Sequence, residues 1–292
     1  MASHQILPAQ LAQPLIRRAV DNALLEDLGQ AGDITTQATL SPDATAVAVM
    51  NVREAGIISG IELARAAFAQ IGDGLKFEAH VTDGDAVLPG QDIATISGNA
   101  RLIMSAERVA LNFMCHMSGI STFTKRYVDE VAGTGAKICC TRKTTPGLRA
   151  FEKFAVKCGG GANHRFGLDD AILIKDNHIA VAGGVKQAVL AAKAFAGHMI
   201  AIEVEVDTLE QFADALDAGA TAVLLDNMSP KQLREAVHAC KGAARLEASG
   251  GINLDSVRKV AETGVEFIST SQITMAASPL DIGLDIKIND QE

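Results

Sequence analysis

Residues 199–226 read MIAIEVEVDTLEQFADALDAGATAVLLD, which is an apolar strand, a helical run and a second apolar strand. The same rhythm includes four further strand-like runs, which read KICCT (137–141), AILIK (171–175), ARLEAS (244–249) and VEFISTS (265–271). Apolar strands that alternate with helices indicate a parallel sheet covered by helices on its outer face. Six such strands favour an incomplete (β/α) barrel of the TIM type over a complete barrel, which has eight strand–helix units. An open doubly wound sheet is the alternative, although no GxGxxG motif follows any strand.

Recognisable end signals support the helices between these strands. Ser229 followed by Pro230 is typical of a helix N-cap with proline at the first helical position. Gly219, Gly242 and Gly264 stand where helices are expected to end.

The first 117 residues have a different, mixed pattern. A helical opening (11–28), a strand (46–52) and a helix (61–71) come before LKFEAHVTDGDAVLPGQDIATISG, which alternates apolar and polar residues between glycine turns, and ARLIMSAERVALNFMCHM (100–117) follows as a long apolar helix. This indicates an α+β sandwich. We therefore predict an N-terminal sandwich domain over 1–117 and a barrel domain over 118–274, and we expect the tail, 275–292, to return to the first domain.

Composition excludes several classes of protein. The 292 residues are 48% hydrophobic and 21% charged with a net charge of −9, which is typical of a globular chain and argues against disorder and against wholesale nucleic-acid binding. The charge is unevenly spread, however. Between Arg142 and Lys175 there are seven basic and three acidic residues, so this segment is basic within an acidic protein.

The chain carries no pattern of a secreted or membrane protein. Its start, MASHQILPAQLAQPLIRRAV, lacks the cationic and apolar regions of a signal peptide, and nowhere do 18 apolar residues run together. Five cysteines without a CxxC spacing are expected to be reduced, small buried residues, with a reactive thiol as the lesser alternative. We predict a cytoplasmic protein.

Polar residues close each of the six strands. In barrels the active site lies at the carboxyl ends of the strands, so these side chains are expected to converge on one mouth. A single charged residue at a strand end is usually solvated surface, whereas six in succession indicate a site. They are Arg142 with Lys143, Lys175, Glu205, Asp226, Ser249 to Gly251, and Thr270 with Ser271.

These residue types indicate a receptor for a polyanion. Several cations with the loop CGGGANHR (158–165), which adds His164 and Arg165, suit a substrate rich in phosphate or carboxylate, although the glycines could equally form a turn. Glu205 and Asp226 would repel a bare polyanion. They fit if Mg²⁺ or ribose hydroxyls lie between them and the phosphates, or if they form ion pairs with the neighbouring cations.

One stretch resembles the signature of the quinolinate phosphoribosyltransferases, and it reads TRKTTPGLRAFEKFAVKCGGGANHRFGLDDAILIKDNHI (141–179). The likeness covers nearly the whole chain. It includes EDLGQAGDITT (26–36), ERVALN (107–112), EVEV (203–206), LLDNM (224–228), SGGI (249–252) and DIGLD (281–285). It implies a sandwich domain and an incomplete barrel, and a reaction in which quinolinate and phosphoribosyl pyrophosphate give nicotinate mononucleotide, pyrophosphate and CO₂ with Mg²⁺, in the de novo synthesis of NAD.

The resemblance also implies roles for residues. It names Lys143, Lys175, Glu205 and Asp226 as catalytic. Arg142, His164, Arg165 and Lys175 would hold the quinolinate carboxylates, and Lys143 the pyrophosphate. Glu205 and Asp226 would take the ribose hydroxyls and the metal, which is held mainly through substrate. The 5′-phosphate would lie on Ser249, Gly250, Gly251, Thr270, Ser271 and Gln272, and Thr141 is implied as a further substrate-binding residue.

Arg108 lies in the other half of the chain. An arginine within an apolar helix is costly unless paired, most simply with Glu107. The resemblance implies that Arg108 reaches the active site of a neighbouring subunit, and hence a homodimer with shared sites.

Three alternatives stay open. A related phosphoribosyltransferase could act on another pyridine or a molybdenum-associated substrate, although Gly147-Leu148-Arg149 and His164-Arg165 favour a dicarboxylate. Lys175 could be the Schiff-base lysine of an aldolase. DGDAVLPGQDIATISG (83–98) could belong to a carrier module, although no lysine lies near its turn. Asp33, Thr35, Thr36 and His178 match the family pattern, but capping and interface packing explain them equally well.

Overall fold

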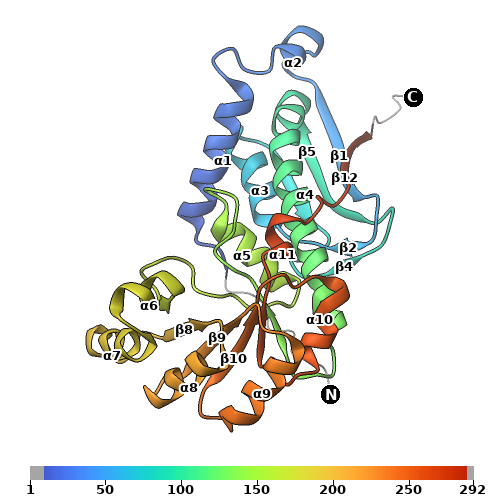
Figure 1. The fold of residues 1–292 in the computed structure, drawn as a ribbon. Coiled ribbons are helices and arrows are strands. Elements are labelled where there is room, and N and C mark those ends of the chain that lie inside the picture. The colour runs from blue at the N-terminus through green and yellow to red at the C-terminus, as the bar shows by residue number, and fades with distance from the viewer. Residues whose placement is uncertain (1–9, 288–292) are drawn as a thin grey trace. The chain divides into compact units, whose positions relative to one another are not determined.

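The computed structural model describes residues 10–287, which form two compact units (Figure 1). The first unit contains residues up to 123 together with 150–160 and the tail from 277, and the second contains 124–149 and 161–276. The sequence pattern instead predicts a boundary after residue 117 and places 150–160 in the barrel domain. Part of the start on which the absence of a signal peptide is predicted, and the last five residues of the tail, lie outside the described residues.

The first unit is built on an antiparallel sheet. Its strand order is β12-β1-β5-β3, and β2 and β4 pair separately. The strands are β1 (Thr45–Val52), β2 (Gly56–Ile57), β3 (Lys76–Ala79), β4 (Ala86–Val87), β5 (Asp92–Asn99) and β12 (Ile282–Lys287). Because β12 lies along β1, with Val49 opposite Asp285, the tail belongs to the N-terminal sheet.

Helices complete this unit. They are α1 (Gln13–Leu28), α2 (Ile34–Thr39), α3 (Ile61–Gln70), α5 (Arg149–Cys158) and the first three quarters of α4 (Ala100–Glu130). The expected helix at 100–117 begins at the right residue but is too short. Its continuation contains the buried hydroxyl residues Ser118, Ser121 and Thr124. Ser121 donates to the carbonyl oxygens of Met117 and Ala155, so its hydroxyl is satisfied without interrupting the helix.

The second unit is a six-stranded parallel sheet with helices between successive strands (Figure 1). The strands are β6 (Lys137–Cys139), β7 (Ile172–Ile174), β8 (Ile202–Val206), β9 (Ala222–Asp226), β10 (Arg245–Ser249) and β11 (Phe267–Ser269). Their order is β6-β11-β10-β9-β8-β7. Beside β6, Cys139 bridges to Ala162 rather than to β7, so the sheet is an incomplete barrel, as the strand count predicts.

Six helices follow these strands. They are α6 (Asp176–Ala182), α7 (Val185–Phe195), α8 (Leu209–Asp217), α9 (Pro230–Cys240), α10 (Leu254–Ala261) and α11 (Gln272–Met275). Ser229 caps α9 and forms a capping box with Gln232, and Gly219 takes a φ of +73° just after α8. Central side chains such as Val204, Val223 and Leu225 are fully buried, which explains why these strands are rich in apolar residues.

Two further features concern insertion into a membrane and the state of the cysteines. Across residues 10–287, none of the helices combines the length and the apolar character needed to cross a membrane. No disulfide joins the five cysteines. Burial raises the pKa of Cys115, and it raises the pKa of Cys158 to about 12, so neither is an activated thiol.

Candidate active site

A cavity of about 670 Å³ opens at the carboxyl ends of the parallel strands. Its wall brings together nearly all the residues expected at the strand ends. They are Thr141, Arg142, Lys143, His164, Arg165, Lys175, Glu205, Asp226, Ser249, Gly250, Gly251, Thr270, Ser271 and Gln272. The ends of the strands and the loops after them supply all of these residues except His164 and Arg165, which lie between α5 and β7. The parallel sheet therefore explains why residues about 130 positions apart in the sequence meet here.

Two arginines of this cavity lie with unsatisfied donors. The Nε atoms of Arg142 and Arg165 are buried and have no hydrogen-bond partner among the described residues. Burial, and then the charge of Arg142, lower the pKa of Arg165 below its usual value, although the guanidinium stays charged at any physiological pH. Arg165 makes one hydrogen bond to protein, from Nη1 to the carbonyl oxygen of Ala171 at 2.9 Å. Two guanidinium groups with free donors can bind a carboxylate or phosphate through two of its oxygens.

An ion pair and an acid with a raised pKa lie on the wall of the same cavity. Lys175 Nζ donates to Glu205 Oε2 at 2.7 Å. Burial raises the pKa of Asp226, and the nearby Asp207 raises it further, while Lys175 and Lys143 oppose this. The side-chain amide of Asn227 donates to Asp226 at 2.6 Å. Because burial and Asp207 disfavour the ionised form of Asp226, a bound cation or hydroxyl donors would stabilise this carboxylate.

The glycine turn after β10 allows backbone to line the cavity. Gly250 has a φ of +96°, and a Cβ there would lie 2.2 Å from Oδ1 of Asn227. Only glycine fits this position. On the next loop, the Thr270 hydroxyl donates to the Ile252 carbonyl oxygen at 2.9 Å and accepts from the amide of Gln272. The two loops are thus fixed to each other.

Some predicted contributors lie elsewhere. Gly159 and Gly160 end α5 with amides that donate to Ala155 and Lys157, so the glycines of CGGGANHR form a turn and do not line the cavity. Arg149 also lies off the wall, and it donates to Thr144 Oγ1 at 3.0 Å and to the Phe166 carbonyl oxygen at 2.9 Å. It joins two loops of the site, so the suggestion that it adds a cation for substrate is wrong.

The structure also gives the positions of Arg108 and of the four residues that match the family pattern without an assigned role, Asp33, Thr35, Thr36 and His178. Arg108 is exposed on α4 and does not line the cavity, so the expected cost of burying it does not arise. Asp33 caps α2, where its carboxylate accepts from the amides of Thr35 and Thr36. His178 accepts a hydrogen bond from the amide of Lys175 through Nδ1. Capping therefore accounts for this group of residues.

Sequence reasoning missed three polar residues of this region, Asn227, Glu203 and Glu247. Asn227 and Glu247 line the cavity, and Glu203 lies below it next to His164. A signal was available for Glu203. Since side chains alternate along a strand, Glu203 must point to the same side as Glu205.

The chain matches two family models that together cover most of its length. Residues 33–118 match the N-terminal domain of quinolinate phosphoribosyl transferase, and residues 120–285 match the C-terminal domain. The chain belongs to the quinolinate phosphoribosyltransferase family. It is 43% identical to the nicotinate-nucleotide pyrophosphorylase (carboxylating) of Mycobacterium leprae, over 92% of this chain and 96% of that protein. Against the probable enzyme of the same name from Bacillus subtilis the identity is 39%, over 94% and 95% of the two chains.

Solved structures agree with this membership of the quinolinate phosphoribosyltransferase family. The nicotinate-nucleotide pyrophosphorylase of Francisella tularensis superposes with a TM-score of 0.92 at 37% identity, over 95% of this chain and 98% of that one. Human nicotinic acid phosphoribosyltransferase, at 13% identity and a TM-score of 0.61, shares the fold alone. The family is one of transferases, so the aldolase and carrier alternatives are set aside. A tobacco relative is named as mitochondrial and a rice relative as chloroplastic, so a cytoplasmic location stays a prediction.

Proposed function

We propose that this cavity transfers the phosphoribosyl group of phosphoribosyl pyrophosphate to quinolinate, with loss of CO₂, to give nicotinate mononucleotide and pyrophosphate in NAD biosynthesis. Membership of the family supports the reaction. The observation that carries the assignment to this cavity is the pair of buried Nε donors of Arg142 and Arg165, for which residues 10–287 provide no acceptor. A dicarboxylate supplies the acceptors that these donors lack, and a substrate with one carboxylate would satisfy fewer of them.

The quinolinate end of the cavity would be formed by Arg142, Arg165 and Lys175. Planar guanidinium groups can hold each carboxylate through two oxygens and so fix the pyridine ring in one orientation. Lys175 Nζ forms an ion pair with Glu205 Oε2 at 2.7 Å. A substrate carboxylate that binds here must therefore compete with Glu205 for the same ammonium group. This competition connects the two halves of the site.

The other substrate would occupy the remaining wall. Lys143 would bind the pyrophosphate, and Ser249–Gly251 with Thr270–Gln272 would enclose the 5′-phosphate through hydroxyls and amides. Glu205 and Asp226 would accept from the ribose hydroxyls. The carboxylate oxygens of Glu205 and Asp226 also fit Mg²⁺, which prefers such ligands and would offset the burial and the Asp207 charge that disfavour ionised Asp226. When bound, it would supply positive charge to the departing pyrophosphate.

Orientation and electrostatics carry the chemistry that we assign to these residues. The ribosyl group gains oxocarbenium character as pyrophosphate departs, and the carboxylates of Glu205 and Asp226 lie where they can stabilise that positive charge. Lys143 stabilises the departing negative charge. The arginines hold the pyridine nitrogen in line with the ribose C1. The new pyridinium then accepts the electron pair left when the adjacent carboxylate leaves as CO₂.

A homodimer with shared sites belongs to the same proposal. Arg108 is an exposed arginine on a largely apolar helix, and it is available to an anion bound outside its own unit. We propose that it completes the quinolinate site of a neighbouring subunit.

The direct test is formation of nicotinate mononucleotide from quinolinate and phosphoribosyl pyrophosphate, with and without Mg²⁺. We expect product and CO₂ in equal amounts, dependence on Mg²⁺, and a loss of about a hundredfold or more in kcat/KM for Lys143→Ala. The matched control is Lys241→Ala, which changes an exposed lysine beyond α9 that is not part of the cavity. Release of CO₂ without phosphoribosyl pyrophosphate would contradict the mechanism.

A further inference from the structure

Thr274 lies on the short helix α11, behind the wall of the active-site cavity, and has no part in the proposed contacts with substrate. It is only 5% exposed. Its hydroxyl donates to the carbonyl oxygen of Lys143 at 2.8 Å, across 131 positions of the sequence, and lies 3.2 Å from the carbonyl oxygen of Ser271. Thr274 therefore joins the loop that carries Lys143 to the segment after β11.

Of these two contacts, the one with Lys143 depends on the hydroxyl. The carbonyl oxygen of Ser271 already accepts from the backbone N–H groups of Thr274 and Met275, at 3.2 and 2.9 Å. In residues 10–287, by contrast, the Thr274 hydroxyl is the one hydrogen-bond donor to the Lys143 carbonyl oxygen. Removal of the hydroxyl would therefore release Lys143 and leave α11 intact.

The other hydrogen bonds of this loop are local. The N–H of Lys143 donates to Thr141 Oγ1 at 3.0 Å, and the Thr144 hydroxyl donates to the carbonyl oxygen of Arg142 at 3.4 Å. Each of these bonds spans two residues, so it shapes the loop without placing it against the rest of the wall. That placement falls to Thr274.

The segment that Thr274 belongs to is itself firmly attached. The Thr270 N–H donates to the carbonyl oxygen of Cys139 at 3.1 Å, and its hydroxyl donates to the carbonyl oxygen of Ile252 at 2.9 Å. Ser271 and Gln272 follow on the cavity wall. Through Thr274, Lys143 is thus connected to both loops at the phosphate end of the cavity.

We infer that Thr274 is a positioning residue, which sets the distance between Lys143 and the loops 249–251 and 270–272. The inference rests on the proposed function, in which Lys143 binds the pyrophosphate and these loops bind the 5′-phosphate. Both groups belong to one ribose, so the sugar limits the distance between them. A site that already has this spacing binds the substrate without the cost of ordering a loop.

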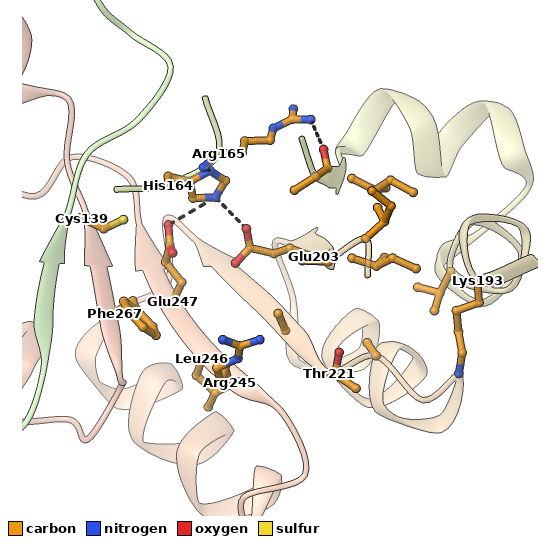
Figure 2. Close-up of a pocket in the computed structure, with 18 of the residues that line it drawn as sticks. Cys139, His164, Arg165, Lys193, Glu203, Thr221, Arg245, Leu246, Glu247 and Phe267 are labelled. Atoms are coloured by element: carbon orange, nitrogen blue, oxygen red, sulfur yellow. Dashed lines mark hydrogen bonds and ion pairs between the residues drawn. The ribbon is translucent and has the colours of Figure 1, made fainter. Parts of the chain in front are cut away.

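The quinolinate side of the Lys143 loop has a different anchor. Arg149, where the loop meets α5, donates to the carbonyl oxygen of Phe166 at 2.9 Å. The adjacent Arg165 donates to the carbonyl oxygen of Ala171 at 2.9 Å (Figure 2). Arg149 therefore holds the loop against the segment that carries Arg165. Loss of each anchor should affect a different substrate.

Calorimetric titration with two ligands tests the inference without reference to turnover. Phosphoribosyl pyrophosphate, with Mg²⁺, would contact both Lys143 and the phosphate loops, whereas ribose 5-phosphate lacks the pyrophosphate. Thr274→Val keeps the shape of the side chain and removes the donor. It should weaken the binding of phosphoribosyl pyrophosphate by about tenfold or more and leave that of ribose 5-phosphate within about threefold. Thr274→Ser keeps the hydroxyl and should bind both ligands within about threefold of the original protein.

Two results of this titration would overturn the inference. An equal loss of affinity for both ligands in Thr274→Val would show that the residue only supports the phosphate loops. An unchanged affinity for phosphoribosyl pyrophosphate would show that the hydrogen bond to Lys143 does not matter. Thr274→Ala also lacks the hydroxyl, and it gives the same readout if the valine variant does not fold.

Steady-state kinetics add a matched control at the other anchor. Thr274→Val should raise the KM for phosphoribosyl pyrophosphate by about tenfold or more and keep the KM for quinolinate within about threefold, and Arg149→Met should do the reverse. The same pattern in both variants would contradict the inference. A wild-type protein that binds neither ligand would refute the proposed function. If the wild type binds phosphoribosyl pyrophosphate and Thr274→Val binds it equally well, only the positioning role is refuted.

Discussion

At the scale of single residues, Arg142 and Arg165 show how a cationic site survives in an acidic protein. Their guanidinium groups lie together, half-buried, with Nε donors that no described residue satisfies. Folding has to tolerate this arrangement, and a bound dicarboxylate would relieve it. The same unsatisfied donors therefore destabilise the empty site and contribute to the affinity for substrate.

Replacing Arg142 with lysine should separate charge from geometry. The charge is kept, but the planar fork that can hold two carboxylate oxygens is lost, so we expect the KM for quinolinate to rise about tenfold or more while the KM for phosphoribosyl pyrophosphate changes little. Steady-state kinetics with each substrate varied would measure this. Arg234→Lys, on the exposed face of α9, is the matched control. An unchanged KM for quinolinate would remove Arg142 from its binding site.

Asp226 allows a test of stability. Its folded-state pKa is raised by burial and by Asp207, so the ionised carboxylate destabilises the fold. This destabilisation is complete above the folded pKa and disappears below the ordinary pKa of aspartate, because both states are then protonated. In EDTA, Asp226→Asn should therefore raise the Tm at pH 7–8, and the gain should vanish as the pH falls through the acid range. A Tm that is lower at neutral pH would contradict this assignment.

At the scale of elements, the long helix α4 contains one position where backbone approaches backbone. A Cβ on Gly119 would lie 2.2 Å from the carbonyl oxygen of Ser278 in the returning tail. Gly119→Ala should cost about 1–3 kcal/mol of stability, since neither backbone can give way easily. Gly197→Ala is the matched control, because a Cβ there meets nothing within 4 Å. Urea unfolding would compare them, and equal stabilities would contradict this packing.

The elements also show what could be predicted from the sequence. The parallel strands were predictable because each is rich in apolar residues and is closed by a polar residue, and every predicted strand end led to the cavity, whereas the glycines of the turn that ends α5 did not. The sequence could not decide where a residue has two possible uses. Gly159 and Gly160 could bind phosphate or end a helix, and Arg149 could bind substrate or join loops; only the positions of Ala155 and Phe166 decide between them.

The contacts of His164 with Glu203 and Glu247 were beyond sequence reasoning for a different reason. The three residues come from a loop and from two strands that are not adjacent in the sheet. Alternation along β8 could place Glu203 inside the barrel, but nothing in the residue order shows that it meets this histidine.

At the scale of the whole molecule, the uneven charge of the chain predicts how sites are completed. The basic segment supplies Arg142, Arg165 and Lys175 to one cavity, whereas Arg108 lies in the acidic remainder of the chain, exposed on α4. If Arg108 serves a neighbouring subunit, each active site of a dimer needs Arg108 from one chain and Lys175 from the other. Substitutions at these two positions should then complement each other.

Co-expression of Arg108→Ala and Lys175→Ala chains that carry different tags tests this. Each homodimer should be nearly inactive, because both of its sites lack one cation. A dimer with one chain of each kind has one site with both cations intact, so an equal mixture, half of which is mixed dimers, should regain about a quarter of the wild-type activity. Purification through both tags should double that specific activity. A doubly tagged dimer that is as inactive as the parents would show that Arg108 acts within its own chain.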